Sequence, residues 1–119
     1  MTKISRADIE KAPDLPTEEV AVPEWGGTVL LRGLNGSDKD KFLGETMKKD
    51  GGEKSIEFKD ITARLVARCL VDETGARLYA DEEIDALGKK SGAVLSRLFK
   101  VAQRLSGLDE AAVQAAEKN

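Results

Sequence analysis

Residues 91–107 read SGAVLSRLFKVAQRLSG, and this stretch decides the fold. Its apolar side chains recur at the spacing of one face of an α-helix, and they are Val94, Leu95, Leu98, Phe99, Val101, Ala102 and Leu105. Ser91 stands where an N-cap residue is preferred, and Gly107 stands where a glycine commonly ends a helix. We therefore predict a helix over residues 91–106 that packs its apolar stripe against the rest of a small domain.

The composition indicates one globular domain, which we expect to span residues 1–119, with 1–15 and 108–119 mobile. The chain has 119 residues, of which 40% are hydrophobic and 34% are charged, and its net charge is −3. A nucleic-acid-binding domain would carry a basic excess, so we expect no nucleic acid partner. No segment has the length of a membrane span or a signal sequence. We therefore expect no membrane partner and a cytoplasmic location.

Two apolar runs around a glycine pair predict a β-hairpin near the N-terminus. Val20 and Val22 alternate with other residues, and residues 28–32 form the returning run. Gly26 and Gly27 between them can adopt the positive φ angles of a two-residue turn. Because Pro23 has no N–H, we expect the first strand either to be an edge strand or to have the N–H position of Pro23 facing outward.

The remaining regular elements complete the predicted architecture. We expect a helix over 37–47, capped by Ser37, and another over 58–71, with a mobile surface loop at KKDGGEKS between them. Shorter helices are expected within residues 2–13 and 82–87, capped by Ser5 or Thr2 and by Asp81 respectively. A short third strand is expected near Arg77–Tyr79, after a turn in which Gly75 needs a positive φ. The prediction is an α+β fold, in which an N-terminal β-hairpin, a small antiparallel sheet, packs on three main α-helices.

The sequence offers no recognisable catalytic, cofactor-binding or metal-binding residues. It contains no histidine, which removes most general-base and metal arrangements. Its one cysteine, Cys69, lies on the apolar row of a predicted helix, so we interpret it as a small buried hydrophobic residue. The segment 88–92 fails the phosphate-loop pattern because Glu83 stands at the leading glycine position. The acidic clusters lack the spacing of a calcium loop, so we predict a non-enzymatic protein.

Three residues are candidates for partner binding: Trp25, Leu108 and Val113. Trp25 follows the first predicted strand, where it can either cover the sheet or form an exposed anchor in an interface. Leu108 and Val113 lie on the apolar face of the C-terminal tail. That face can either cap the core or bind a partner, because both kinds of helix have the same pattern. Exposed apolar positions on the hairpin or the tail could also support self-association.

Four stretches in this order resemble the tail assembly chaperones of long-tailed bacteriophages and prophages. They are LPTEEV at 15–20, PEWGGTV at 23–29, CLVDETG at 69–75 and LFKVAQRLSGL at 98–108. The resemblance implies a non-enzymatic protein that binds the tape measure protein and keeps it soluble before the tail tube polymerises. It further implies recruitment of the tail tube protein, a place in the host bacterial cytoplasm, and absence from the mature virion. Many family members also have a longer form made by translational frameshifting.

Two other classes of protein remain open at this point. One is a structural head–tail connector or neck protein, which would assemble into a stable ring and remain in the phage particle. The other is a small host adaptor that recruits one partner. Detection in purified virions would favour the structural protein, and absence from virions would favour the chaperone.

Overall fold

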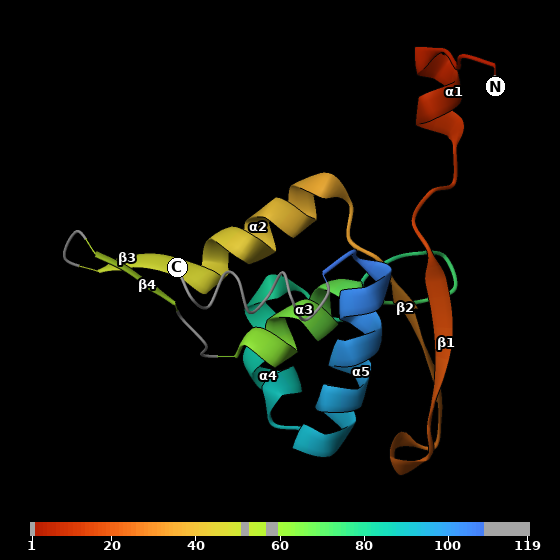
Figure 1. Ribbon diagram of the computed structural model, residues 1–119. Helices are drawn as coiled ribbons and strands as arrows, with labels where there is room; N and C mark the ends of the chain where they lie inside the picture. The colour runs from red at the N-terminus through yellow and green to blue at the C-terminus, as the bar shows by residue number, and fades with distance from the viewer. Residues whose placement is uncertain (1, 51–52, 57–59, 109–119) are drawn as a thin grey trace.

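The computed structural model describes residues 2–50, 53–56 and 60–108 (Figure 1). It confirms the α+β class, with a small antiparallel sheet near the N-terminus and helices packed beside it. The elements in chain order are α1 (Arg6–Lys11), β1 (Thr17–Val22), the 3₁₀ turn η1 (Pro23–Trp25), β2 (Gly27–Arg32), α2 (Gly36–Thr46), β3 (Met47–Asp50), β4 (Glu53–Ile56), α3 (Ile61–Cys69), β5 (Leu70–Val71), the 3₁₀ turn η2 (Asp81–Glu83), α4 (Ile84–Gly88) and α5 (Gly92–Leu105).

The core lies between the sheet and the pair of helices α3 and α5, which cover one face of the sheet (Figure 1). The side chains that are almost fully buried come from all of these elements, and they include Val22, Leu31, Leu65, Val66, Cys69, Leu70, Val94 and Leu98. Helix α4 closes one side of this cluster with Leu87, and α2 contributes Phe42. The scarcity of aromatic residues therefore leaves a core built mainly from aliphatic side chains.

Helix α5 matches the prediction for residues 91–106 at both ends. The Ser91 hydroxyl accepts a hydrogen bond from the Val94 N–H at 3.3 Å. At the other end, Gly107 has a φ of 71° and its N–H bonds the Arg104 carbonyl, while the Leu108 N–H bonds the Gln103 carbonyl at 2.7 Å. These two bonds form a Schellman motif. Local capping residues thus fix the length of the helix.

The turn of the N-terminal hairpin lies earlier than the predicted Gly26-Gly27 turn. Val22 pairs directly with Gly27, so the loop consists of Pro23, Glu24, Trp25 and Gly26. The fixed φ of proline suits the first position of a 3₁₀ turn. Gly26 alone takes a positive φ, 82°, and its N–H bonds the Pro23 carbonyl at 3.0 Å. The predicted position of β1 at the edge is confirmed by the strand order β1-β2-β5.

The third strand of the sheet is Leu70–Val71, and the prediction of a strand at Arg77–Tyr79 is wrong. Helix α3 ends at Cys69, two residues before the predicted end, because the next two residues pair with Leu31 and Leu30 of β2. The predicted segment contributes one isolated bridge, between Arg77 and Val71. The turn between them has the expected positive φ at Gly75, 90°. The start of the predicted 58–71 helix lies partly outside the described residues.

The predicted loop at KKDGGEKS is instead a two-stranded antiparallel hairpin. Met47 pairs with Ile56, and Asp50 pairs with Glu53. Backbone pairing between strands does not require apolar side chains. The sequence of this segment contains a Gly-Gly pair, which is typical of a hairpin turn, as is the pair Gly26-Gly27.

Two helix caps also differ from the prediction. Helix α2 is capped by Asn35, whose Oδ1 accepts the Asp38 N–H at 2.8 Å, so Ser37 lies inside the helix. The brief helix near residue 82 begins after Ala80, because Glu83 reaches back to the Ala80 N–H at 2.9 Å. The Ser5 cap of α1 is confirmed. Helix α1 stands away from the core (Figure 1), and it has no buried residues.

Candidate partner-binding surface

The one cysteine of the chain is a buried, protonated thiol, as predicted. Cys69 is fully buried, and its Sγ lies 3.7 Å from the Ser106 hydroxyl oxygen. Burial raises the pKa of the Cys69 thiol to about 11. A nucleophilic cysteine needs a lowered pKa and an accessible thiolate. The environment of Cys69 therefore buries the thiol and raises its pKa, whereas the environment of a catalytic cysteine exposes the thiolate and lowers its pKa.

Within the described residues, no group of three or more His, Cys, Asp or Glu side chains is placed to hold a metal ion. None of the helices in residues 2–50, 53–56 and 60–108 is long and apolar enough to cross a membrane. Two hollows lined by described residues are the candidate surfaces considered below.

Trp25 lies at the tip of the N-terminal hairpin, half-buried and in contact with the edge of the core. Together with Tyr79, Glu24 and Lys90 it lines an open hollow of about 380 Å³. Its packing against the core agrees with the interpretation that Trp25 covers the sheet, and its role as an interface anchor stays a prediction. The hollow combines two aromatic rings with one acidic and one basic side chain.

The position of the hairpin tip is fixed by ion pairs to α5. Glu24 receives two hydrogen bonds from Arg97 Nη2, at 2.8 and 2.9 Å. Farther along the same helix, Arg104 bonds Glu18 of β1 at 2.7 Å. A hydrogen bond from the backbone of Glu24 and the bonds from Arg97 lower the pKa of the Glu24 carboxyl. Exposed pairs of this kind add little stability. The Glu24 pair places the hairpin tip beside α5, and the Glu18 pair joins the other end of β1 to the same helix.

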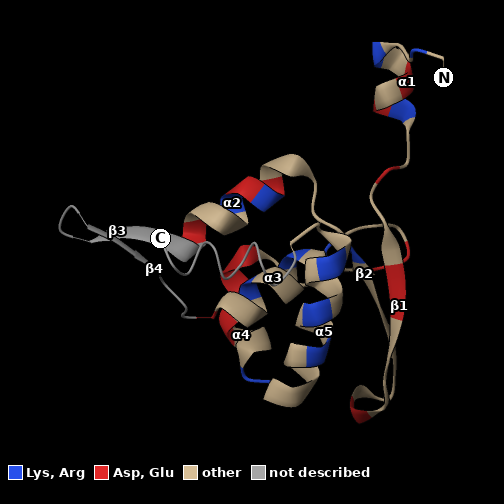
Figure 2. Cartoon of the chain, viewed as in Figure 1, with Lys and Arg blue, Asp and Glu red and all other residues tan. Residues whose placement is uncertain are grey.

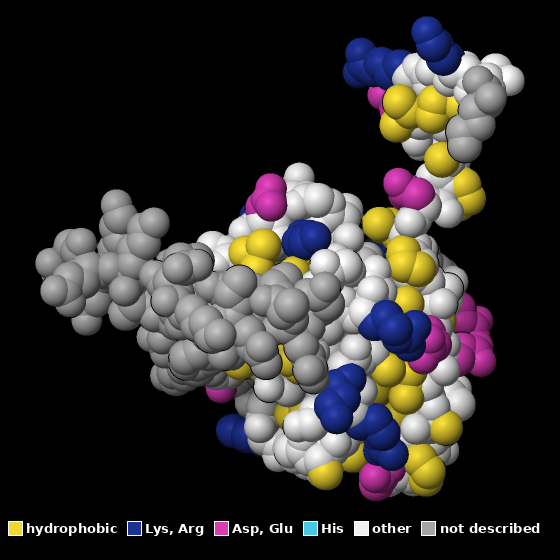
Figure 3. Space-filling view, in the orientation of Figure 1, with side chains coloured by type: hydrophobic (Ala, Val, Ile, Leu, Met, Phe, Trp, Pro, Cys, Tyr) yellow, Lys and Arg dark blue, Asp and Glu magenta, His cyan; other side chains and the backbone are white. Residues whose placement is uncertain are grey.

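The charged residues of α5 and β1 separate the apolar groups on this face of the molecule. Figure 2 shows basic residues repeated along α5 and acidic residues along β1. Figure 3 shows hydrophobic side chains in a band between them, with blue groups on one side and magenta groups on the other. Elsewhere, Ile4 and Ile9 at the N-terminal helix are 66% and 58% exposed. On the face drawn in Figure 3, the apolar groups of the described residues therefore form a band bordered by charged side chains.

The other two predicted contact residues do not join Trp25. Leu108 is 1% exposed and follows the end of α5, where it belongs to the core. A partner cannot reach Leu108 in this conformation, so its position agrees with the alternative that this residue caps the core. Val113 lies outside the described residues. Trp25 is therefore the one of the three predicted residues that the structure places beside an open hollow.

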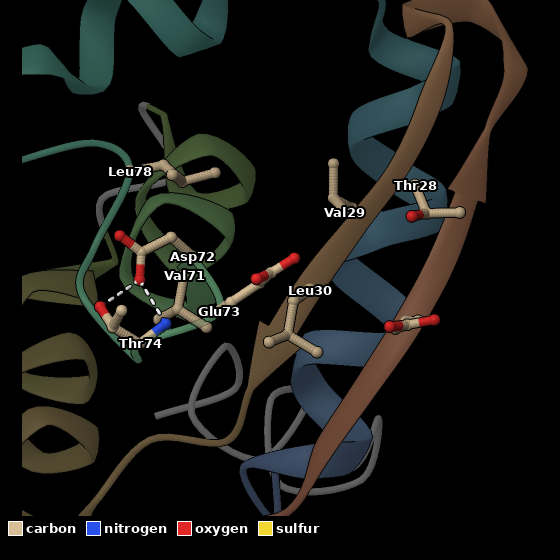
Figure 4. Close-up of a pocket in the computed structure, with 9 residues that line it drawn as sticks. Thr28, Val29, Leu30, Val71, Asp72, Glu73, Thr74 and Leu78 are labelled. Atoms are coloured by element: carbon tan, nitrogen blue, oxygen red, sulfur yellow. Dashed lines mark hydrogen bonds between the residues drawn. The ribbon is translucent and has the colours of Figure 1, made fainter.

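A second hollow was missed by the sequence analysis. It is a groove of about 530 Å³ between β2 and the turn that follows β5. Figure 4 shows Thr28, Val29 and Leu30 of β2 on one side, with Leu78 and the turn residues on the other side. The complete lining consists of Glu19, Thr28, Val29, Leu30, Val71, Asp72, Glu73, Thr74 and Leu78. We call it the β2 groove. The segment DETG at 72–75 predicts the turn, but no local pattern predicts that this turn faces β2.

The turn on one side of the β2 groove is held by Asp72. Its Oδ1 accepts hydrogen bonds from the Thr74 hydroxyl at 2.6 Å and the Thr74 N–H at 2.8 Å (Figure 4), and also from the Ala76 N–H at 3.0 Å. The bonds from Thr74 and Ala76 lower the pKa of the Asp72 carboxyl, so it is ionised at neutral pH. One wall of the groove is therefore a rigid turn that carries a negative charge.

Comparison with known proteins gives a consistent result. A family model described as phage tail assembly chaperone matches residues 11–119. A solved structure described as the tail assembly chaperone of bacteriophage HK97 has a similar fold, with a TM-score of 0.60 and 21% sequence identity. The similarity covers 83% of this chain and 94% of the HK97 chain. No curated protein sequence matches this chain.

Proposed function

The chain belongs to the phage tail assembly chaperone family, and from this premise we propose that it binds the tape measure protein and keeps it soluble during tail assembly. The observation that carries the proposal is the family match over residues 11–119. A role in tail assembly follows from the family, and the identity of the client is our proposal. The role is non-enzymatic, because holding a client in solution requires binding surfaces and no bond chemistry.

The surfaces described above suit a client that is long and partly apolar. Each apolar hollow is small and has charged residues at its border, so a single contact would be weak and reversible. Many copies along one client can together bind it strongly, since each bound copy raises the effective concentration of neighbouring contacts. The half-buried Trp25 supplies the kind of rigid aromatic group that is enriched at binding hot spots.

The proposal extends to other partners and to location. We expect the tail tube protein to be recruited to the chaperone-bound client, and copies of the chain to associate with one another on it. The complex would form in the host bacterial cytoplasm and dissociate before the virion is complete. Mass spectrometry of purified virions tests this part, because a head–tail connector would be detected there and the chaperone would be absent.

Co-expression tests the proposed function directly. The chain is produced with and without the candidate tape measure protein from the same genome, and soluble fractions and pull-downs are compared. We expect the client to be soluble only when the chain is present, and to co-purify with several copies of it. If the solubility of the client is the same in both cultures, the proposed function is wrong.

Trp25 can be tested in the same assay. Trp25→Ala should weaken client binding by about 30-fold if the residue is a hot spot, whereas Trp25→Phe should retain most of the binding because it keeps an aromatic ring. Thermal melts of both variants show whether the loss comes from unfolding instead. Unchanged client binding by a folded Trp25→Ala variant would rule out the anchor role.

A further inference from the structure

Strand β2 has one edge that is only partly paired. Along its other edge, β1 pairs with all six residues of β2, from Gly27 to Arg32. Strand β5 pairs only with Leu30 and Leu31, because the chain turns away after Val71. Within the described part of the chain, Gly27, Thr28 and Val29 therefore have no strand neighbour on this side. The open stretch is about 10 Å long at the rise of a β-strand.

This open edge offers backbone groups for hydrogen bonding. In an antiparallel sheet, the N–H and C=O of successive residues point to opposite edges. One of the two residues Thr28 and Val29 therefore directs both groups away from β1, toward the β2 groove. An added strand that continues the line of β5 would satisfy them, as in other cases of strand addition to an exposed sheet edge.

The β2 groove also offers apolar contacts beside that edge. Leu30 is half-buried, and Leu78, on the opposite wall, is 49% exposed although it is a large aliphatic residue. Val71 lies between them at the end of β5. Because Val71 is only 2% exposed, side chains on one face of an added strand would contact mainly Leu30 and Leu78. The groove is thus suited to an extended segment in which aliphatic residues occur at alternate positions.

The charge of the β2 groove restricts what can occupy it. Its lining contains three carboxylates, Glu19, Asp72 and Glu73, and no lysine or arginine. Glu19 and Glu73 are exposed, and neither has an ion-pair partner among the described residues. A cationic segment would gain favourable interactions from all three groups, and an anionic segment would be repelled.

From the open edge, the apolar wall and the three carboxylates, we propose that the β2 groove binds an extended segment of the client in which aliphatic residues alternate with lysine or arginine. The segment adds to β2 as a short strand in line with β5. This inference rests on the proposed function, because it assigns the groove to the client. It adds the binding surface, the backbone conformation and the charge of the bound segment.

Two segments of the chain itself fit the β2 groove less well. The tail after Leu108 carries Asp109, Glu110 and Glu117 against a single Lys118, so its charge has the wrong sign. Helix α1 of a second copy has the exposed Ile9, but a helical backbone does not present the extended row of N–H and C=O groups that pairs with a strand edge.

Peptide binding to the full chain tests the proposal. The probe is a fluorescent eight-residue peptide that alternates lysine with valine, measured by fluorescence polarisation. Three further peptides serve as comparisons: one has glutamate in place of lysine, one has the same residues in an order with helical period, and one carries N-methyl groups at alternate residues. We expect binding of the first peptide to be at least about tenfold tighter than that of the others. Similar binding of all four peptides would overturn strand addition.

Substitutions in the β2 groove locate the binding. The double variant Glu19→Gln with Glu73→Gln should bind the lysine peptide about fivefold more weakly, and Leu78→Ser should also weaken it. Glu82→Gln is the matched control, because Glu82 is exposed and lies outside the groove. If the control weakens binding as much as the double variant, the attraction is to the net charge of the chain and the groove assignment is wrong.

The same variants separate this proposal from the proposed function. If the groove variants lose the lysine peptide but still keep the tape measure protein soluble, the groove does not bind the client and the proposed function stands. If the wild-type chain fails to keep the client soluble, the proposed function fails whatever the peptides show. Light scattering measures whether the chain self-associates. If the wild-type chain self-associates and the groove variants do not, a second copy occupies the groove and the assignment to the client is overturned.

Discussion

Gly33 fixes the distance between the sheet and the end of α5, and replacing it with alanine should destabilise the fold. The residue is buried just after β2. A Cβ atom built on it would overlap the carbonyl oxygen of Leu105 and lie 2.8 Å from the carbonyl carbon. It would also lie 3.3 Å from Cδ of Pro16. Because the first obstacle is backbone, no side-chain rotation can relieve the overlap, and either the strand end or the helix end must move.

The loss in free energy of unfolding caused by Gly33→Ala can be estimated from the contacts that the substitution would displace. The Gly33 N–H bonds the Pro16 carbonyl at 2.9 Å, and the next residue, Leu34, donates its buried N–H to the Ser106 hydroxyl at 3.0 Å. Overpacking of a close contact costs about 1–3 kcal/mol. Loss of the acceptor for a buried N–H costs about 1–3 kcal/mol in addition. We expect Gly33→Ala to lower the free energy of unfolding by about 3 kcal/mol, a large part of the stability of a small domain.

Urea denaturation followed by circular dichroism measures this loss. With a slope of about 1.5 kcal/mol per molar urea, the midpoint should fall by about 2 M while the slope stays constant. Gly44→Ala is the matched control, because Gly44 lies within α2 with open space around it. That substitution should raise stability by up to about 1 kcal/mol through helix propensity. A midpoint for Gly33→Ala equal to that of the wild type would refute the steric argument.

Three further predictions concern the same region. Ser106→Ala should cost about 1–3 kcal/mol in urea denaturation, because it removes the acceptor of the buried Leu34 N–H, whereas Ser96→Ala on the exposed face of α5 should change stability by less than about 0.5 kcal/mol. Gly107→Ala forces a φ of 71° on a residue with a Cβ, so the melting temperature should fall by the equivalent of about 1 kcal/mol. The thiol of Cys69 has a pKa of about 11 when folded and an ordinary value of 9.0. As pH rises, the unfolded chain therefore loses this proton before the folded chain does. The contribution of the thiol to the free energy of unfolding is fully present below pH 9 and decreases as pH rises from 9 to 11. Measurements of unfolding across this pH range should show that Cys69→Ala removes the decrease.

The helices could be predicted from sequence because their signals are local. In α5, the apolar period, the Ser91 cap and the Gly107 stop all lie within the helix or next to it, and the structure has all three. The sheet depends on residues far apart in the chain. Leu70 and Val71 continue the apolar row of α3, and only their pairing with β2, about 40 residues earlier, makes them a strand. No local pattern distinguishes the last turn of a helix from such a strand.

The candidate surfaces were only partly predictable for a related reason. Trp25 stood out because tryptophan is enriched at interfaces, and the structure places it beside a hollow. The β2 groove arises because β2 has six residues and β5 has two, a mismatch that appears only when both strands and their register are known. For Leu108 the sequence was ambiguous. An apolar residue just after a helix looks the same in sequence whether it binds a partner or fills the core.

The two hollows share one short segment of backbone. Leu78 lines the β2 groove, and the next residue, Tyr79, lines the hollow beside Trp25. The segment is held by polar contacts at each end: Asp72 bonds the turn before it, and Arg77 pairs with Asp81 at 3.0 Å. Leu78 is largely exposed, so substitutions there can change the groove without removing a core contact. Tyr79, by contrast, packs against the core, so a substitution there would alter the hollow beside Trp25 and the core packing together.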